Sequence, residues 1–221
     1  MAARIASGKP REDHQPDRAG GAPTAAALRP RLRALRAAMT AADRAAADAR
    51  IIAFLQGRIH DYLSASRWGN RPVVLSAFWP IGDEPDLRPA LHAWAGDSRL
   101  ELALPVIQTR AAPLEFRAWT PGAAMAPGAY RIPEPQGTHA CVPDIVLVPT
   151  LGYTADGDRI GYGGGYYDRT LAALRSRGEP FVAIGVAYAC GLLPPDVHLP
   201  EPHDMRLDEI VTEEAVLAVP R

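Results

Sequence analysis

The sequence has few cysteines, no long hydrophobic run and almost no net charge, and each of these absences argues against a class of protein. Its two cysteines, Cys141 and Cys190, form no C-x-x-C pair and belong to no His/Cys cluster with zinc-site spacing. No apolar stretch approaches the roughly twenty residues that a bilayer-spanning helix needs. The net charge of −1 argues against a broad nucleic-acid-binding surface. We therefore expect a cytoplasmic protein without membrane or nucleic-acid partners.

The length of 221 residues suits one domain with an N-terminal tail. Residues 1–24 are rich in proline, glycine and charge, with almost nothing to bury, which is typical of a disordered segment. They contain no signal-peptide apolar core, and their acids (Glu12, Asp13 and Asp17) argue against a transit peptide. We predict a disordered tail over residues 1–24 and a single domain over residues 25–221.

The Ala/Arg-rich segment 28–55 predicts two helices. Pro30 suits a first helical position, which makes Arg29 approximately the N-cap residue of the first helix. Apolar residues form one stripe of this helix (Leu32, Leu35 and Met39), and arginines recur on another face (Arg29, Arg33 and Arg36). The arginine face is either a solvated surface or a ligand-binding one.

The second helix and the strands follow from local patterns. Thr40 followed by Asp43 predicts a helix N-terminus, with the helix running from Ala41 to about Leu55. Strand patterns cover residues 73–78, 100–107, 114–119, 144–149, 181–187 and about 210–211, and helix-compatible runs cover residues 87–95 and 166–177. This alternation predicts a three-layer α/β/α sandwich with a mostly parallel central sheet.

The most informative segment is 159–169, with the sequence Arg-Ile-Gly-Tyr-Gly-Gly-Gly-Tyr-Tyr-Asp-Arg. Four of the five positions from Gly161 to Gly165 are glycines, so the backbone can approach a ligand closely. A strand precedes this loop and a helix follows it, and unpaired N–H groups at a helix N-terminus suit a phosphate. Arg159 and Arg169 add positive charge, and Asp168 lies in the first helical turn, where a carboxylate is able to hold a metal. The segment predicts a nucleotide site.

Neither familiar glycine fingerprint is present in this loop. A P-loop ends in Gly-Lys-Ser/Thr, whereas here Gly165 is followed by Tyr166. The dinucleotide fingerprint needs a third glycine at the position of Tyr166. A plain turn leading into a helix is the alternative interpretation.

A second candidate loop, residues 79–86, follows the first strand of the predicted sheet. In parallel sheets, ligands bind beyond the carboxyl ends of the strands, which is where this loop lies. Glu84 is either a ligand contact or a solvated acid, and Asp86 is either a ligand contact or a cap for the next helix.

Four segments together carry a family resemblance. They are Arg-x-x-Leu-Arg at 29–33, Gly-Asp-Glu-Pro-Asp at 82–86, the glycine segment at 159–169, and Pro-His-Asp-Met-Arg-Leu-Asp at 202–208. In this order and spacing, from about residue 28 to the C-terminus, they resemble the 5-formyltetrahydrofolate cyclo-ligase (methenyltetrahydrofolate synthetase) family. The resemblance implies a Rossmann-like (NagB/RpiA/CoA-transferase-like) fold. It also implies ATP-driven closure of 5-formyltetrahydrofolate to 5,10-methenyltetrahydrofolate, with ATP as co-substrate, Mg²⁺ as cofactor and a monomeric enzyme.

The resemblance assigns roles residue by residue. ATP binding is implied for Arg29, Arg33, Arg159, Ile160, Gly161, Tyr162, Gly163, Gly164, Gly165, Tyr166 and Tyr167. Folate binding is implied for Trp79, Glu84, Tyr162, Gly163, Gly164, Gly165 and Tyr166, and Mg²⁺ binding for Asp168 and Asp204. No catalytic residue is implied beyond phosphate and metal positioning by Arg33, Arg159 and Asp168.

Three departures from the family pattern stand out. Many relatives carry Lys where this chain has Arg29, and many carry Lys where it has Gly164. The segment 188–199 lacks a glutamine that is frequent in relatives and is a few residues longer. Two other functions remain open at this point, a non-catalytic folate- or nucleotide-binding relative and an α/β enzyme acting on a sugar phosphate or a coenzyme A ester.

Overall fold

A computed structural model describes residues 23–65, 68–195, 197 and 200–219. Residues 1–22 of the predicted tail lie outside this range, so the prediction of disorder there stays a prediction. Among the described residues, no helix is long and apolar enough to cross a membrane.

An eight-stranded sheet forms the centre of the molecule, in the order β12-β11-β10-β7-β1-β2-β3-β6. Strands β11, β10, β7, β1 and β2 pair in parallel, whereas β12, β3 and β6 add antiparallel edges. The bounds are Val73–Ser76 for β1, Leu100–Val106 for β2, Glu115–Ala118 for β3, Ala140–Cys141 for β6, Ile145–Pro149 for β7, Val182–Val186 for β10, Glu209–Val211 for β11 and Val216–Ala218 for β12. Two small hairpins pair β4 (Met125–Pro127) with β5 (Pro133–Pro135) and β8 (Gly152–Tyr153) with β9 (Arg159–Ile160).

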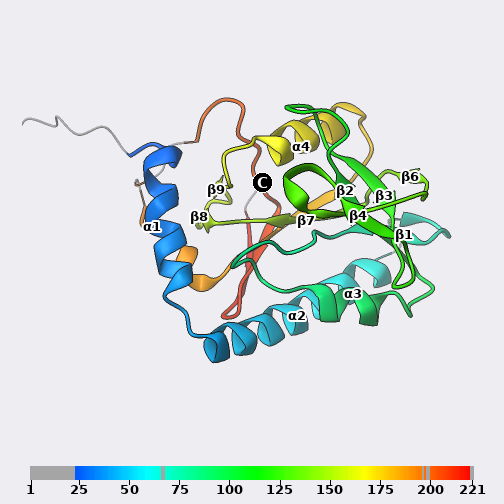
Figure 1. Cartoon of the computed structure of the whole chain (residues 1–221), viewed down its shortest axis with the longest axis horizontal. Coiled ribbons are helices and arrows are strands. Elements are labelled where there is room, and N and C mark those ends of the chain that lie inside the picture. Colours follow the sequence, from blue (N-terminus) through cyan, green and yellow to red (C-terminus); the bar gives the residue numbers. More distant parts are fainter. Residues whose placement is uncertain (1–22, 66–67, 196, 198–199, 220–221) are drawn as a thin grey trace, which may run out of the picture.

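Helices cover both faces of the sheet. Helices α2 (Ala41–Ser64) and α3 (Arg88–Trp94) lie on one face, and α4 (Tyr166–Ser176) lies on the other (Figure 1). Side chains of a strand point alternately to the two faces. In β7, Ile145 and Leu147 accordingly pack with α2 and α3, while Val146 and Val148 pack with α4. The predicted three-layer α/β/α sandwich with a mostly parallel sheet is confirmed.

The second helix, α2, begins at Ala41 as predicted. The Thr40 hydroxyl accepts a hydrogen bond from the Asp43 N–H at 3.1 Å and so caps the helix. The helix extends nine residues beyond the predicted end because Ile59 continues the buried stripe, which has a spacing of four residues (Ala47, Ile51, Leu55 and Ile59).

The first helix, α1 (Ala25–Ala37), corrects two expectations. Thr24, not Arg29, is the N-cap residue, and Pro30 lies inside the helix on an exposed side. Leu35 does not belong to the buried stripe, because 41% of it is exposed. The buried stripe consists of Leu28, Leu32 and Arg36.

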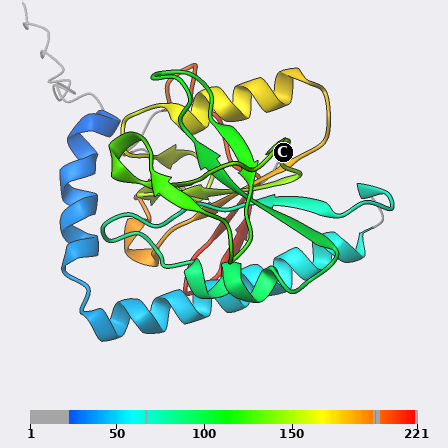
Figure 2. The same ribbon diagram turned by 45° about the vertical axis from the view of Figure 1, so that its right-hand side comes forward.

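Helix α1 stands apart from the helices that cover the sheet (Figure 2). Leu28 and Leu32 pack against Leu151, Ile160 and Leu193 in a small cluster that is separate from the two large cores. This packing places α1 beside β8, β9 and the glycine loop, so the cluster decides where the arginines of α1 lie.

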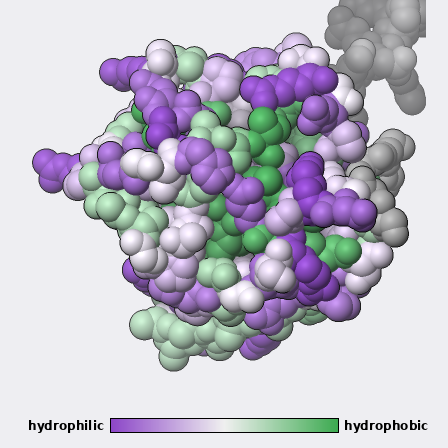
Figure 3. All heavy atoms as spheres, turned by 90° about the vertical axis from the view of Figure 1, so that its right-hand side faces the viewer, coloured by the Kyte–Doolittle hydropathy of each residue, from purple (hydrophilic) through white to green (hydrophobic). Residues whose placement is uncertain are grey.

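The face at the right-hand side of Figure 1 shows a narrow apolar strip bordered by hydrophilic side chains (Figure 3). A hollow of about 310 Å³ lies at the amino ends of the parallel strands, lined in part by Pro72, Asp144, Leu174 and Phe181. Asp144 accepts two hydrogen bonds from Arg71, at 2.6 and 2.7 Å, and one from the Val74 N–H at 2.8 Å. These contacts connect the start of β7 to the start of β1 and so stabilise this end of the sheet.

Candidate active site

A cavity of about 690 Å³ opens at the carboxyl ends of the parallel strands, as expected for an α/β sheet. Its walls come from α1, the loops after β1 and β2, the β4–β5 hairpin, the glycine loop and the segment 201–204. It brings together every residue to which the sequence assigned a site role: Arg29, Arg33, Trp79, Glu84, Arg159, Ile160, Gly161, Tyr162, Gly163, Gly164, Gly165, Tyr166, Tyr167, Asp168 and Asp204.

The glycine loop connects β9 to α4 in a conformation that side chains would hinder. Gly163 has a φ of 97° and Gly165, the N-cap of α4, has a φ of 62°. A Cβ on Gly163 would lie 3.2 Å from the Arg29 guanidinium, and one on Gly164 would lie 2.8 Å from the Tyr166 ring. The N-terminus of α4 has no side-chain cap, so its first N–H groups remain available to an anion.

Arginines from α1 line the end of the cavity that is formed by the glycine loop. Arg29 donates from Nε to the Gly161 carbonyl at 2.9 Å, and the Arg33 guanidinium lies 6.0 Å from the centre of the Tyr162 ring. Arg169 donates from Nη2 to the Gly164 carbonyl at 2.7 Å. Positive charge therefore surrounds the glycine loop, although Gly164 itself carries none.

Arg159 and Asp168 form the inner charged pair of this end. Nη1 and Nη2 of Arg159 donate to Oδ1 of Asp168 at 2.9 and 2.7 Å, and the Met205 N–H donates to the same oxygen at 3.1 Å. Burial lowers the pKa of Arg159, and the carboxylates of Asp168 and Asp204 oppose this effect. Oδ2 of Asp168 has no hydrogen-bond partner among the described residues and remains available to a cation.

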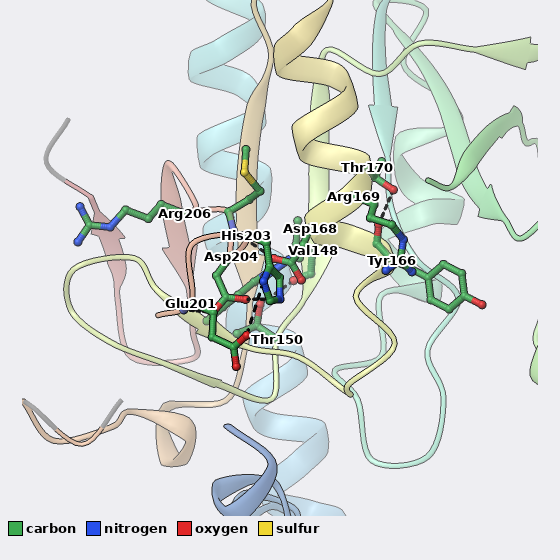
Figure 4. Close-up of polar contacts among 12 residues, drawn as sticks. Val148, Thr150, Tyr166, Asp168, Arg169, Thr170, Glu201, His203, Asp204 and Arg206 are labelled. Carbon is green, nitrogen blue, oxygen red and sulfur yellow. Dashed lines mark hydrogen bonds and ion pairs between the residues drawn. The ribbon is translucent and has the colours of Figure 1, made fainter. Parts of the chain in front are cut away.

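The segment 201–204 brings a second carboxylate to the same place. Figure 4 shows Glu201, His203 and Asp204 gathered beside Asp168, whereas Tyr166 and Arg169 lie apart from this group. Oδ2 of Asp204 accepts a hydrogen bond from the Glu201 N–H at 2.8 Å, and Oδ1 lies 4.0 Å from Nε2 of His203. No group of three or more metal-binding side chains occurs in the described part of the chain, so any cation here would rely on two carboxylates and on oxygens from ligands or water.

The other end of the cavity is apolar around one buried carboxylate. Phe78, Leu104, Ile107, Leu114 and Ile132 line it together with Trp79. Glu84 is only 7% exposed, and its Oε2 accepts a hydrogen bond from the Ile81 N–H at 2.9 Å. Burial raises the pKa of Glu84, and hydrogen bonds from Ile81 and Tyr162 and the charge of Arg36 work against that rise. An ion pair between Asp83 and Arg44 of α2 anchors the loop that carries Glu84.

Two acids near the sequence motifs lie outside the cavity. Oδ1 of Asp86 accepts a hydrogen bond from the Arg88 N–H at 3.0 Å, which supports the capping interpretation. Oδ2 of Asp208 accepts from the Ala183 N–H at 2.9 Å and connects its segment to β10. None of the described residues in the segment 188–199 lines the cavity, so the departure there does not touch the described wall.

Several cavity residues were not predicted from the sequence. Tyr130 and Glu134 come from the β4–β5 hairpin, which lies between the predicted strands 114–119 and 144–149. Glu134 is buried and accepts a hydrogen bond from the Ile107 N–H at 3.2 Å, and Tyr130 meets Tyr166 edge to face with ring centres 6.3 Å apart. The acid between two prolines at 133–135 is the signal that marks Glu134, whereas nothing in the sequence marks Tyr130.

Comparisons with known proteins identify the family of this chain. A sequence model of the 5-formyltetrahydrofolate cyclo-ligase family matches residues 22–213. A 5-formyltetrahydrofolate cyclo-ligase of Mycolicibacterium smegmatis is 30% identical over 166 residues, which cover 70% of this chain and 79% of that protein. A cyclo-ligase of Mycoplasma pneumoniae is 39% identical over 71 residues, which cover 32% of this chain and 40% of that protein.

Solved structures show the same fold. The structure of Aquifex aeolicus 5,10-methenyltetrahydrofolate synthetase superimposes with a TM-score of 0.69 at 25% identity, covering 89% of this chain and 93% of that one. A 5,10-methenyltetrahydrofolate synthetase from Mycoplasma pneumoniae superimposes with a TM-score of 0.63 at 22% identity, covering 86% of this chain and 98% of that one. With the family match over most of its length, the chain belongs to the 5-formyltetrahydrofolate cyclo-ligase family.

Proposed function

We propose that the cavity closes 5-formyltetrahydrofolate to 5,10-methenyltetrahydrofolate, with ATP converted to ADP and phosphate. One observation carries the assignment of the site. A single cavity has a basic, glycine-lined end and an apolar end with one buried carboxylate, and distant chain segments build both ends. This division suits a triphosphate on one side and a flat heterocycle on the other.

The chemistry explains why both substrates must share one site. A formamide carbonyl is a poor electrophile, and loss of its oxygen as hydroxide is very slow. Transfer of the γ-phosphoryl group to the formyl oxygen converts that oxygen into part of a leaving group. N10 then attacks the formyl carbon, the new C–N bond forms as the C–O bond breaks, phosphate departs, and N10 loses its proton. The protein contributes mainly by positioning the reactants and neutralising charge.

At the basic end, we assign the phosphates to the glycine loop and to the arginines of α1. Arg29 and Arg33 lie one turn apart on α1 and both line the cavity. The free N–H groups at the start of α4 supply further donors. Arg159 forms an ion pair with Asp168. We therefore assign to Arg159 the role of orienting the Asp168 carboxylate and of adding positive charge beside the glycine loop.

The two carboxylates suit a magnesium ion. Asp168 and Asp204 each keep one oxygen without a close hydrogen-bond partner among the described residues, and Mg²⁺ commonly binds through one or two carboxylates plus phosphate oxygens and water. When bound, such an ion would neutralise charge on the transferring phosphoryl group.

At the apolar end, we assign the folate ring to Glu84, Trp79 and the aromatic side chains at the mouth of the cavity. The Glu84 carboxylate is the buried acceptor for ring N–H donors, and Tyr166 offers an aromatic face. The described lining of the cavity comes from one chain, and a monomeric enzyme is part of this proposal.

The test is the growth of the methenyltetrahydrofolate absorbance band with 5-formyltetrahydrofolate, ATP and Mg²⁺, followed by omission of each component in turn. We expect the band only when all three are present. Tight folate binding with no band under any condition would contradict the enzyme and favour a folate-binding relative.

A further inference from the structure

Arg36 is a buried cation that the sequence placed only on the arginine face of the first helix, as a solvated or ligand-binding side chain. It is 4% exposed and lies on the inner side of α1. Its Nη1 donates to the Tyr162 hydroxyl at 2.6 Å, its Nη2 donates to the Thr150 carbonyl at 2.8 Å, and its guanidinium lies 5.5 Å from the centre of the Tyr188 ring. A buried arginine normally pairs with a carboxylate. Among the described residues, none forms an ion pair with Arg36.

An opposite charge faces Arg36 across one hydroxyl group. Tyr162 interacts with Arg36 on one side and with the Glu84 carboxylate on the other. Both the Tyr162 hydroxyl and the charge of Arg36 lower the pKa of Glu84. Arg36 and Glu84 therefore form a buried pair of opposite charges that is separated by Tyr162.

We propose that Arg36 is a positioning residue, which acts through the Tyr162 hydroxyl to keep Glu84 ionised and directed at the folate ring. The proposal rests on the proposed function, in which Glu84 accepts hydrogen bonds from the ring. It assigns to α1 a second task besides contact with phosphate, because Arg36 lies one turn beyond Arg33 on the same helix.

The physical reason is the cost of burying a lone carboxylate. A carboxylate in an apolar wall gains a proton unless a nearby positive charge and hydrogen-bond donors stabilise it. Once protonated, one of its oxygens becomes a donor and no longer accepts a ring N–H. Three groups besides Arg36 face Glu84, and none is a cation: the Ile81 N–H from its own loop, Tyr162 from the glycine loop and Tyr167 from α4. Arg36 supplies the only positive charge found to act on Glu84 among the described groups.

The chain offers a matched control in Arg58. This arginine of α2 also joins a tyrosine and a buried glutamate, since Nε of Arg58 donates to Oε2 of Glu209 at 3.0 Å and the Tyr62 hydroxyl donates to Oε1 at 2.6 Å. None of these three residues lines the cavity. Arg58 is half-buried, with 30% of its side chain exposed. The Arg58→Met substitution therefore reports what loss of an arginine that joins a tyrosine to a buried glutamate does to the fold alone.

The experiment is equilibrium binding of 5-formyltetrahydrofolate to the full-length protein without ATP, from about pH 5.5 to pH 9. The wild type, Arg36→Met, Arg36→Lys and Arg58→Met are compared, with melting curves for each. We expect Arg36→Met to move the midpoint of the pH dependence upward by about one pH unit, which weakens binding about tenfold below that midpoint and much less above it. Arg36→Lys should recover part of this shift, and Arg58→Met should lower the melting temperature without moving the midpoint.

The outcomes separate the two proposals. A wild type that binds no folate and forms no product would overturn the proposed function itself. A wild type that binds and turns over, with Arg36→Met weakened equally at every pH, would overturn the role of Arg36 and leave a purely structural arginine. A second variant, Tyr162→Phe, checks the link: if its shift and that of Arg36→Met simply add in the double variant, the two residues act independently and the proposal is wrong.

Discussion

Both terminal nitrogens of Arg159 donate to a single oxygen of Asp168, which leaves the other oxygen of this carboxylate facing the cavity. The buried arginine thus orients the acid and directs its unpaired oxygen toward the place where phosphates and a metal ion are proposed to lie. This arrangement makes Asp168 the most direct test of the basic end of the site.

Replacing Asp168 with Asn should lower kcat by about a hundredfold or more, because the site loses the charge that holds a cation. Asparagine keeps the shape of the side chain, so the fold-decrease in kcat should exceed any fold-change in the affinity for folate. The control is Asp158→Asn, since Asp158 pairs with Arg206 at 3.1 Å and does not line the cavity. Initial rates at several Mg²⁺ concentrations measure the effect, and an Asp168→Asn enzyme with normal rates would contradict the metal assignment.

Gly163→Ala should raise KM for ATP by about tenfold or more. Alanine is strained at a φ of 97°, at a cost of about 1–2 kcal/mol, and its Cβ would press on the Arg29 guanidinium. Gly161→Ala is the control within the same loop, because nothing lies within 4 Å of a Cβ there. Steady-state kinetics with varied ATP distinguish the two variants, and a Gly163→Ala enzyme with the KM of the wild type would contradict the prediction.

Arg29→Ala should raise KM for ATP by about tenfold, since it removes a cation beside the glycine loop. Arg31→Ala is the control, because Arg31 is exposed on the same helix and does not line the cavity. Ammonium sulfate should weaken ATP binding to the wild type more than to Arg29→Ala. A larger rise in KM for ATP in Arg31→Ala than in Arg29→Ala would contradict the assignment of the phosphates to this end of the cavity.

Glu84→Gln should weaken folate binding and yet leave the free protein at least as stable at neutral pH. Burial raises the pKa of Glu84 above its unfolded value even with Arg36 nearby, so its contribution to stability is present at low pH and is lost as the pH rises through the folded pKa. Glutamine escapes this loss. The melting temperature of Glu84→Gln should exceed that of the wild type by about 2–4 °C near pH 8 and approach it near pH 5. A Glu84→Gln protein that melts below the wild type near pH 8 would contradict this prediction.

Local signals were enough to predict the parallel strands, β3 and the start of α2, but not the short edge strands β6 and β12. Thr40 and Asp43 form a cap that depends on four consecutive residues, and the strands are short apolar runs. The prediction of the start of α1 was wrong because it relied on a single residue, Pro30. Proline at a first helical position is only a preference, and the cap at Thr24 with the leucine stripe of α1 prevailed over it.

The candidate site divides in the same way. Segments with an unusual composition, such as the glycine loop, were identified directly, and the structure collects them in one cavity. The burial of Arg36 and the place of Tyr130 were not predicted, because both depend on contacts between segments. Arg36 meets Tyr162 across 126 positions of the chain, and Tyr130 meets Tyr166 across 36. No pattern within a short window contains such a contact.

The small separate cluster under α1 has a consequence for how this helix opens. Leu28 and Leu32 hold α1 through few apolar partners, so α1 should be the first helix to detach in native-state fluctuations, before either large core is disturbed. Detachment would carry Arg29 and Arg33 away from the glycine loop. In the proposed function ATP binds more tightly when both arginines are in place, so it should slow amide hydrogen exchange in α1 and leave exchange in β7 unchanged. Nucleotide affinity and the local stability of this one helix are in that sense two measurements of a single equilibrium.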